Sequence, residues 1–447
     1  MIRPDLSIRR LLPIWAPLAL TFLLISGSTP VVNASINRLP TATRLEDLAA
    51  FGVLLRLVIF LHSPLFVVRE IVIKLTVDRA GWRRAFVFCV ATGIVMAGIE
   101  LVLALTPLGR AVLDKLTNEP ELAARAHRAL LAVSPVPVLI AVRGFYQAQQ
   151  IRVDDTLFVG LGTLARLIFV AVFGLHIAPA LGIEGTVMGG LALSLGLAVE
   201  TLWAVLRART LARPPERAPA GTRRLGLAGF ALPLMFANML SVTPQLLYLK
   251  IAGRVQDPDV SLGALQEAVS LQWLFTSSTL ALSALATAKV HRPGDGKAML
   301  RFGLVVGMAL SVLLVLVVFT PLRSWFLTSV LGQRNADVRE AVRVALMLGA
   351  WMPLLMAVRF TLRGVLIARG LSKPISVAMV SSLLLLSLSL VFELPPHTAN
   401  GAFNAYVWWN AALLLELGIL ARAAVRSGRP GGGLPPPPKT PAEMAVG

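Results

Sequence analysis

Long apolar stretches recur along almost the whole chain, and they constrain its fold more than any other feature. A hydrocarbon core of ~30 Å takes about 20 helical residues to cross, and about twelve windows have this length. Because they are continuous runs of Leu, Ala and Val, they predict spanning helices. The windows cover approximately residues 11–33, 48–75, 85–105, 127–149, 155–178, 184–206, 226–251, 262–289, 299–320, 341–368, 374–394 and 401–425.

Composition supports a membrane location. Hydrophobic residues make up 56% of the 447 residues, charged residues 15%, and the mean hydropathy is +0.76. This leaves too little polar surface to coat a soluble particle, so we expect an all-α polytopic membrane protein. The first window follows Arg3, Arg9 and Arg10 and also resembles a cleavable signal peptide, but its apolar stretch is long for one, and we interpret it as an uncleaved helix.

The basic residues set the expected orientation. The net charge of +19 does not indicate a nucleic-acid partner, because Lys and Arg are not gathered into one soluble basic domain. Most of them lie at the two ends of the chain and in every second predicted loop. By the positive-inside rule, both termini are therefore expected in the cytoplasm.

The two halves of the chain repeat each other. PVLIAVR at 137–143 matches PLLMAVR at 353–359 in five of seven positions, 216 residues apart. The repeat predicts two pseudo-symmetric six-helix lobes, at 1–206 and 226–426, joined by a basic linker at 207–225 and followed by a disordered tail at 427–447. With an even number of helices in each half, an axis along the membrane normal relates the lobes, and substrate would lie between them. The same spacing, within two residues, links Pro17 to Pro233, Thr29-Pro30 to Thr243-Pro244, Gly185 to Gly401 and Glu200 to Glu416.

Four stretches carry a likeness to a known family: PLALT at 17–21 with Asn33 further along the helix, LAAFG at 48–52, Leu108-Gly109 with DKL at 114–116, and residues 137–160 with their LFVG ending. In their order and spacing they resemble the progressive ankylosis protein family, a branch of the multidrug/oligosaccharidyl-lipid/polysaccharide flippase superfamily. The likeness covers the first half well and the second half mainly through the repeat.

This resemblance implies a two-lobed transporter that exports small polyvalent anions, with inorganic pyrophosphate, ATP and citrate as the substrates of the animal members. The high Ala, Leu, Arg and Gly content and the short loops suggest a bacterial member. We therefore expect a multi-pass protein of the bacterial inner membrane, with a small anionic solute and the lipid bilayer as partners and a proton or sodium as coupling ion.

Arginines within the spanning windows are the first candidates for a binding site. An ionisable group in hydrocarbon costs ~3 kcal/mol, so it usually faces a water-filled cavity or a partner. Arg56, Arg143, Arg166 and Arg359 would offer bidentate donors to a carboxylate or phosphate and are the predicted substrate-binding residues. Arg143 and Arg359 could instead extend to the membrane interface.

Other polar residues within the spanning windows are further candidates. Glu200 and Glu416, at equivalent positions of the repeat, could take up protons for coupling or pair with Arg, and Glu70 beside Arg69 could form a local ion pair. Glu100 and Glu267 are left without an assigned role. His62 and Pro64 predict a kink that could line a cavity, and Asn33 is grouped with them.

Nothing in the sequence predicts catalysis, a metal or a cofactor. The five histidines, His62, His127, His176, His291 and His397, are scattered without metal-ligand spacing. The alternatives are a flippase of lipid-linked saccharides, a cation-coupled drug antiporter of the same superfamily, an integral-membrane transferase and, least favoured, a non-transporting membrane scaffold.

Overall fold

The computed structural model describes residues 7–76, 78–117, 119–153, 155–211, 227–290, 294–369, 371, 373–394 and 398–427. The described residues are helical, apart from turns and short connections. The first half contains α1 (Ile8–Asn37), α2 (Arg44–His62), η1 (Ser63–Val67), α3 (Val68–Leu75), α4 (Arg79–Leu105), α5 (Pro107–Thr117), α6 (Pro120–Val133), α7 (Val136–Arg152), α8 (Thr156–Val172), η2 (Phe173–Ile177), α9 (Ala178–Ala180) and α10 (Gly185–Ala208).

The second half follows the same order. It contains α11 (Leu227–Val242), α12 (Pro244–Ala252), α13 (Pro258–Thr276), η3 (Ser277–Leu280), α14 (Ala281–Lys289), α15 (Asp295–Phe319), α16 (Leu322–Trp325), η4 (Phe326–Val330), α17 (Ala336–Gly349), α18 (Met352–Ala368), α19 (Lys373–Val391) and α20 (Gly401–Ser427).

Ten helices of the described part are long and apolar enough to cross a membrane, and up to twelve if each of two bent pairs is one span. The bent pairs are α6 with α7, at 44°, and α17 with α18, at 42°. Pro137 and Pro353, which the repeat matches, lie in the first turn of α7 and α18. Because proline has no backbone N–H, each removes a hydrogen bond to the preceding turn and allows the bend. The sequence predicted these two segments as single helices, and the structure bends them.

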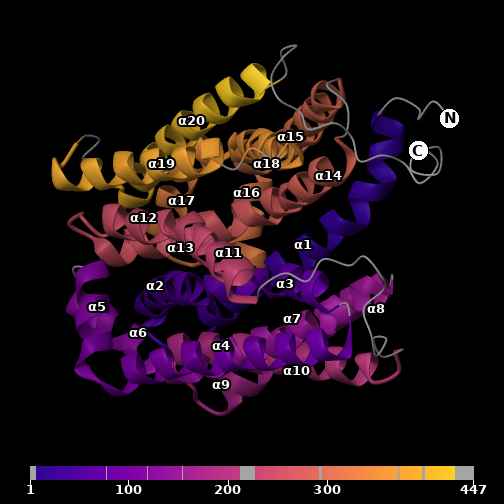
Figure 1. Cartoon of the computed structure of the whole chain (residues 1–447). Helices are drawn as coiled ribbons and strands as arrows, with labels where there is room; N and C mark the ends of the chain where they lie inside the picture. The colour runs from indigo at the N-terminus through magenta and orange to yellow at the C-terminus, as the bar shows by residue number, and fades with distance from the viewer. Residues whose placement is uncertain are drawn as a thin grey trace, which may run out of the picture.

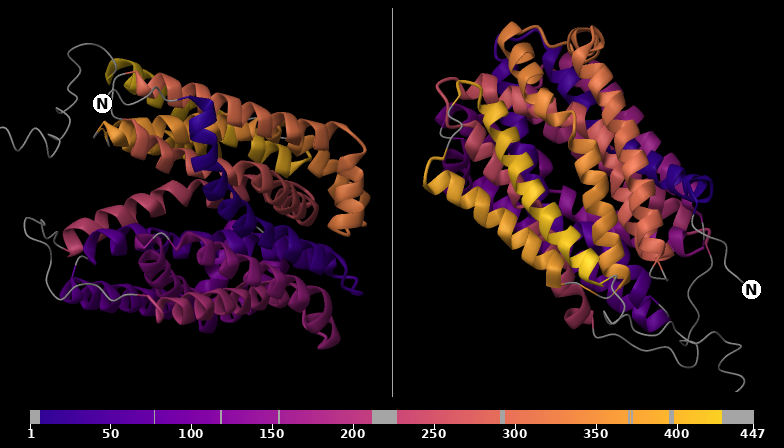
Figure 2. Two further views of the ribbon diagram at one scale, coloured as in Figure 1. Left: turned by 90° about the vertical axis from the view of Figure 1, so that its right-hand side faces the viewer. Right: turned by 90° about the horizontal axis from the view of Figure 1, so that it is seen from above.

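The helices form two layers (Figures 1 and 2). The helices from α2 to α10 make up one layer, and those from α14 to α20 make up the other, while α11, α12 and α13 lie between them. α1 runs from one layer to the other and packs against α8 of the first half and against α13, η3 and α14 of the second. The core therefore continues across both halves of the chain.

The first helix of each half packs against the broken span of the opposite half. Trp15 of α1 donates its indole N–H to the backbone oxygen of Ser278 in η3, at 3.2 Å. Asn238 of α11 donates its side-chain amide to the backbone oxygen of Ser63 in η1, at 2.6 Å. Both accepting carbonyls belong to the 3₁₀ segments, so these hydrogen bonds fasten the halves together at the breaks.

These breaks recur at the repeat distance. η1 begins at Ser63 and η3 begins at Ser277, each in the middle of the second span of its half. The interruption predicted at His62 and Pro64 is present, since α2 ends at His62 and the 3₁₀ segment begins there. η3 has no proline, so the repeated geometry depends on the packing of α1 and α11 as well as on residue type.

The predicted linker and tail fall mostly outside the described residues. Of the linker at 207–225, the structure describes 207–211, and α10 extends to Ala208, slightly past the expected boundary. Of the tail at 427–447, only Ser427 is described.

Candidate functional site

A buried polar network joins α1, α2 and α13 where the two halves meet. We call it the interface network, and its side chains are less than 6% exposed although the surrounding helices are apolar. Unsatisfied polar groups are costly in such a place, so its hydrogen bonds define its structure. Its members are Asn33 and Asn37 of α1, Arg56 of α2, Gln266, Glu267 and Ser270 of α13, and Gln333 after η4.

Glu267 lies at the centre of the interface network and is fully buried. Its Oε1 accepts a hydrogen bond from the amide of Asn37 at 2.6 Å, and its Oε2 accepts one from the amide of Asn33 at 3.3 Å. Within the described residues, no Lys, Arg or His lies within 4 Å of this carboxylate. Two amides from the opposite half of the chain therefore hold a buried carboxylate without a countercharge.

Arg56 lies at the other end of the interface network, 5% exposed. Its Nη1 donates to the backbone oxygen of Gly52 at 3.0 Å and to Oε1 of Gln266 at 2.9 Å. Its Nη2 is buried and has no hydrogen-bond partner among the described residues. Gln266 in turn donates to Oδ1 of Asn33 at 3.2 Å, so one amide links the guanidinium to the partners of Glu267.

A second cluster lies inside the first half, around Glu200 of α10. Its carboxylate accepts from Nη1 of Arg143 at 2.6 Å, from Nη1 of Arg166 at 3.4 Å, from the amide of Gln147 at 3.0 Å and from the hydroxyl of Thr163 at 3.0 Å. Both arginine side chains are 13% exposed, and Glu200 is 1% exposed. Two arginines against one carboxylate leave this cluster with one uncompensated positive charge.

The equivalent position in the second half holds Arg359 and Glu416. Nε of Arg359 lies 2.7 Å from Oε1 of Glu416, and the side chains are 13% and 5% exposed. The two arginines that could have extended to the membrane interface, Arg143 and Arg359, instead point to carboxylates within their own half. The two halves therefore share a buried arginine–glutamate pair as well as a sequence pattern.

Each half has a second arginine in this region, but it stands at a different position of the repeat in each half. Arg363, one turn after Arg359, stands where the first half has Gln147, while Ser382 stands where the first half has Arg166. Arg363 has a buried Nε without a hydrogen-bond partner among the described residues. Each half therefore keeps two arginines close to one glutamate.

His62 and Glu100 form a third buried pair. Nε2 of His62 at the end of α2 lies 2.5 Å from Oε1 of Glu100 on α4, and both side chains are almost fully buried. Glu100 had no assigned role from the sequence, and the structure gives it this partner. The side chain of Glu70 lies outside the described residues.

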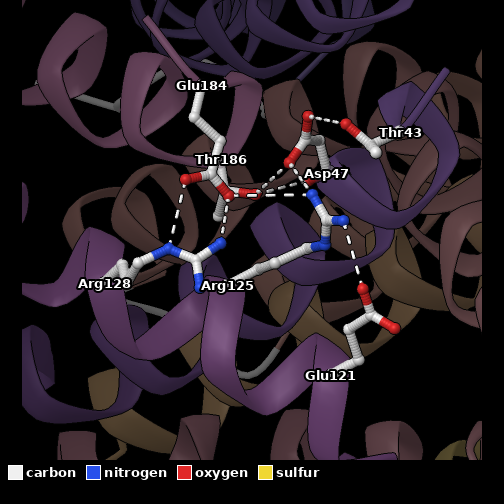
Figure 3. A network of polar contacts seen from close by, with 7 residues as sticks. All are labelled: Thr43, Asp47, Glu121, Arg125, Arg128, Glu184 and Thr186. Atoms are coloured by element: carbon white, nitrogen blue, oxygen red, sulfur yellow. Dashed lines mark hydrogen bonds and ion pairs between the residues drawn. The ribbon is translucent and has the colours of Figure 1, made fainter. Parts of the chain in front are cut away.

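A further ion-pair cluster lies between α2, α6 and α10 of the first half (Figure 3). Asp47 of α2 lies 3.2 Å from Nη1 of Arg125 on α6 and accepts the hydroxyl of Thr186 on α10 at 3.1 Å. Glu184 accepts from Arg128 at 2.7 Å and lies 3.7 Å from Arg125. With Glu121, which also pairs with Arg125, three carboxylates face two arginines, so this cluster joins three helices and offers no surplus positive charge to an anion.

The predicted site residues thus separate into two groups. Arg56 and Asn33 come together in the interface network, whereas Arg143 and Arg166 meet at Glu200, and Arg359 lies apart in the second half. Sequence reasoning missed Gln266 and Asn37, and it gave Glu267 no role. A signal was present, because Gln266-Glu267 with Ser270 interrupts an apolar helix with polar residues one turn apart.

The fold is shared by known membrane proteins, although no family model and no curated protein matches the chain in sequence. An inward-facing multidrug resistance MATE family transporter of the MOP superfamily superposes with a TM-score of 0.66 at 12% identity, over 90% of this chain and 94% of the other. The lipid II flippase MurJ, inward closed, superposes at 0.64 and 12% identity, over 93% and 90%. A MOP superfamily transporter of Pyrococcus furiosus, described with a binding pocket of reverse polarity, superposes at 0.57 and 10% identity, over 92% and 94%.

The chain therefore has the fold of the multidrug/oligosaccharidyl-lipid/polysaccharide flippase superfamily, an all-helical polytopic membrane architecture. This confirms the predicted all-α polytopic fold class, whereas the cytoplasmic location of both termini stays a prediction. The narrower resemblance to the progressive ankylosis family stays a prediction.

Proposed function

We propose that this protein is a secondary transporter that moves a small polyvalent anion, of the pyrophosphate, ATP or citrate class, by alternating access between its two lobes. The observation that carries the proposal is the buried Nη2 of Arg56, which has no hydrogen-bond partner among the described residues and lies where the halves meet. An unused guanidinium N–H in a desolvated place is a donor suited to a carboxylate or phosphate oxygen.

The charge balance favours an anion over a cation. The Glu200 cluster carries two arginines against one carboxylate, and Arg359 with Arg363 lies close to Glu416 alone. Each half thus contributes a positive field, and in a low-dielectric interior such fields act over longer distances than in water. A cationic drug would meet repulsion at both sides of the interface.

The interface network provides a mechanism for coupling. An anion that binds Arg56 competes with Oε1 of Gln266, and released Gln266 weakens its bond to Asn33. Asn33 also holds Glu267, so events at the guanidinium reach the carboxylate through one amide chain. We propose that Glu267, rather than the arginine-paired Glu200 and Glu416, takes up the coupling proton or sodium.

A lipid-linked saccharide is the second candidate, because the lipid II flippase MurJ shares the fold over most of both chains. The two candidates differ in the path of the substrate. A flippase would transfer its cargo between leaflets, whereas the proposed transporter would accumulate a soluble anion.

The test is uptake into proteoliposomes. Radiolabelled pyrophosphate, ATP and citrate are offered under imposed proton or sodium gradients to the native protein, to Arg56→Gln and to Arg84→Gln, an exposed arginine that serves as the matched control. We expect the native protein and the control to take up at least one anion and Arg56→Gln to lose that uptake. If none of the anions moves while a fluorescent lipid-linked saccharide changes leaflet, the anion proposal fails and the flippase takes its place.

A further inference from the structure

A basic pocket lies between the ends of α18, α19 and α20, away from the interface network. Its volume is about 790 Å³, and its lining includes Arg369, Lys373, Arg422 and Arg426. α20 packs against both α18 and α19, and its C-terminal end is the yellow segment of Figure 1. The sequence predicts that this end of the helices faces the cytoplasm.

The lining of this basic pocket is unbalanced in charge. It has four cationic side chains and, among the described lining residues, no carboxylate. None of the four forms an ion pair within the described part of the chain. Like charges brought together without a counterion destabilise a fold, so the arrangement indicates an anionic ligand.

Arg369 is buried in the wall of this pocket and is held there by hydrogen bonds. It is only 6% exposed, and its Nη1 donates to the backbone oxygen of Ala424 at 3.0 Å and to the hydroxyl of Ser427 at 2.7 Å. Its Nε is buried without a hydrogen-bond partner among the described residues. Two bonds to α20 thus fix the guanidinium while one N–H stays available.

An apolar face leads away from the basic pocket. Val377 belongs to the lining, and Val380, Leu384 and Leu388 follow it on α19 at spacings of three and four residues. All four are about half exposed. The spacing places them on one side of the helix, so a continuous apolar strip begins where the cations end.

We propose that this basic pocket binds the phosphate headgroup of an anionic phospholipid, with its acyl chains along the apolar face of α19. Clustered cations recognise the phosphate, as basic pockets between membrane helices do for lipids with two phosphates. The apolar strip distinguishes a lipid from a free phosphate, because a soluble anion would not use it. The site is separate from Arg56, so the inference does not depend on the transported substrate.

The test measures lipid retention by the full chain purified in detergent. Native mass spectrometry follows binding of cardiolipin, phosphatidylglycerol and phosphatidylethanolamine to the native protein, to the double variant Arg422→Gln/Arg426→Gln and to Arg83→Gln/Arg84→Gln. The last is the matched control, because it removes two exposed arginines from the start of α4. Lys373→Gln is a second, independent change in the lining.

We expect cardiolipin to bind more tightly than phosphatidylglycerol and phosphatidylethanolamine to bind weakly. Each cation near an anionic lipid contributes about fivefold in affinity, so the double variant loses about 30-fold and Lys373→Gln about fivefold, with unchanged thermal melting. The control retains native affinity. Equal binding by the double variant and the native protein overturns the proposal, and so does displacement of the lipid by equimolar inorganic phosphate or pyrophosphate, which would make this a free-anion site.

Discussion

Nη1 of Arg143 lies 2.6 Å from Oε2 of Glu200, and the two residues are 57 positions apart on α7 and α10. The same two residue types meet again, 57 positions apart, as Arg359 and Glu416 on α18 and α20. A duplicated sequence has therefore kept a buried ion pair in each half, although such pairs are costly to desolvate.

Glu200→Gln should destabilise the protein strongly. The change leaves Arg143 and Arg166 buried without their countercharge, and breaking one partner of a buried pair costs about 3–5 kcal/mol. We expect a clearly lower melting temperature in detergent. The double variant Arg143→Gln/Glu200→Gln should recover part of the loss, and a double variant that melts below both single variants would contradict the pairing.

Arg56→Lys should retain the fold and impair transport. A lysine keeps the positive charge but lacks the forked geometry that presents Nη2. Losing one charge-assisted hydrogen bond of about 1.5–3 kcal/mol predicts a KM for the anion that rises about tenfold or more. Anion uptake in proteoliposomes measures this, and an unchanged KM would show that charge alone matters at this position.

Glu267→Gln should separate coupling from binding. The amide cannot take up a proton, and it presents N–H₂ toward one of the two asparagines that now donate to the carboxylate. A gradient of one pH unit supports about tenfold accumulation through one coupled proton, and the variant should lose it. Exchange of internal for external anion should continue, and loss of both activities together would place Glu267 in binding instead.

Gly364→Ala should destabilise the packing of α18 against α14. A Cβ at Gly364 would lie 2.5 Å from the backbone oxygen of Ser283 and 2.6 Å from Cβ of Ala286. Overpacking of this kind costs about 1–3 kcal/mol. The control is Gly418→Ala in α20, where a Cβ meets nothing within 4 Å and alanine favours the helix by up to about 1 kcal/mol. The melting temperature of Gly364→Ala should fall, and that of Gly418→Ala should rise.

Much of the fold could be predicted from local features of the sequence. α4 and α15 end at their C-caps Thr106 and Thr320, because each threonine is followed by a proline and the residue before a proline disfavours the helical conformation. The bends at α6–α7 and α17–α18 were missed, since hydropathy over a window registers apolar length and is insensitive to the direction of the helix axis.

The candidate site was only partly predictable. Arg56 could be singled out because charge within an apolar helix is costly wherever the helix packs. Its connection through Gln266 to Asn33 and Glu267 joins residues more than 200 positions apart, and no local pattern encodes that contact.

The sequence by itself determined that the chain is a duplicated set of membrane helices with excess positive charge, because helix length, hydropathy and repeat spacing are properties of short segments. Only the tertiary structure decided which charges are neutralised and which are not. Arg143 and Arg359 have carboxylate partners, while among the described residues Arg56 keeps an N–H without an acceptor and Glu267 has no countercharge. The physical reason is that pairing depends on which helix faces meet across the two halves, and long-range packing sets those faces.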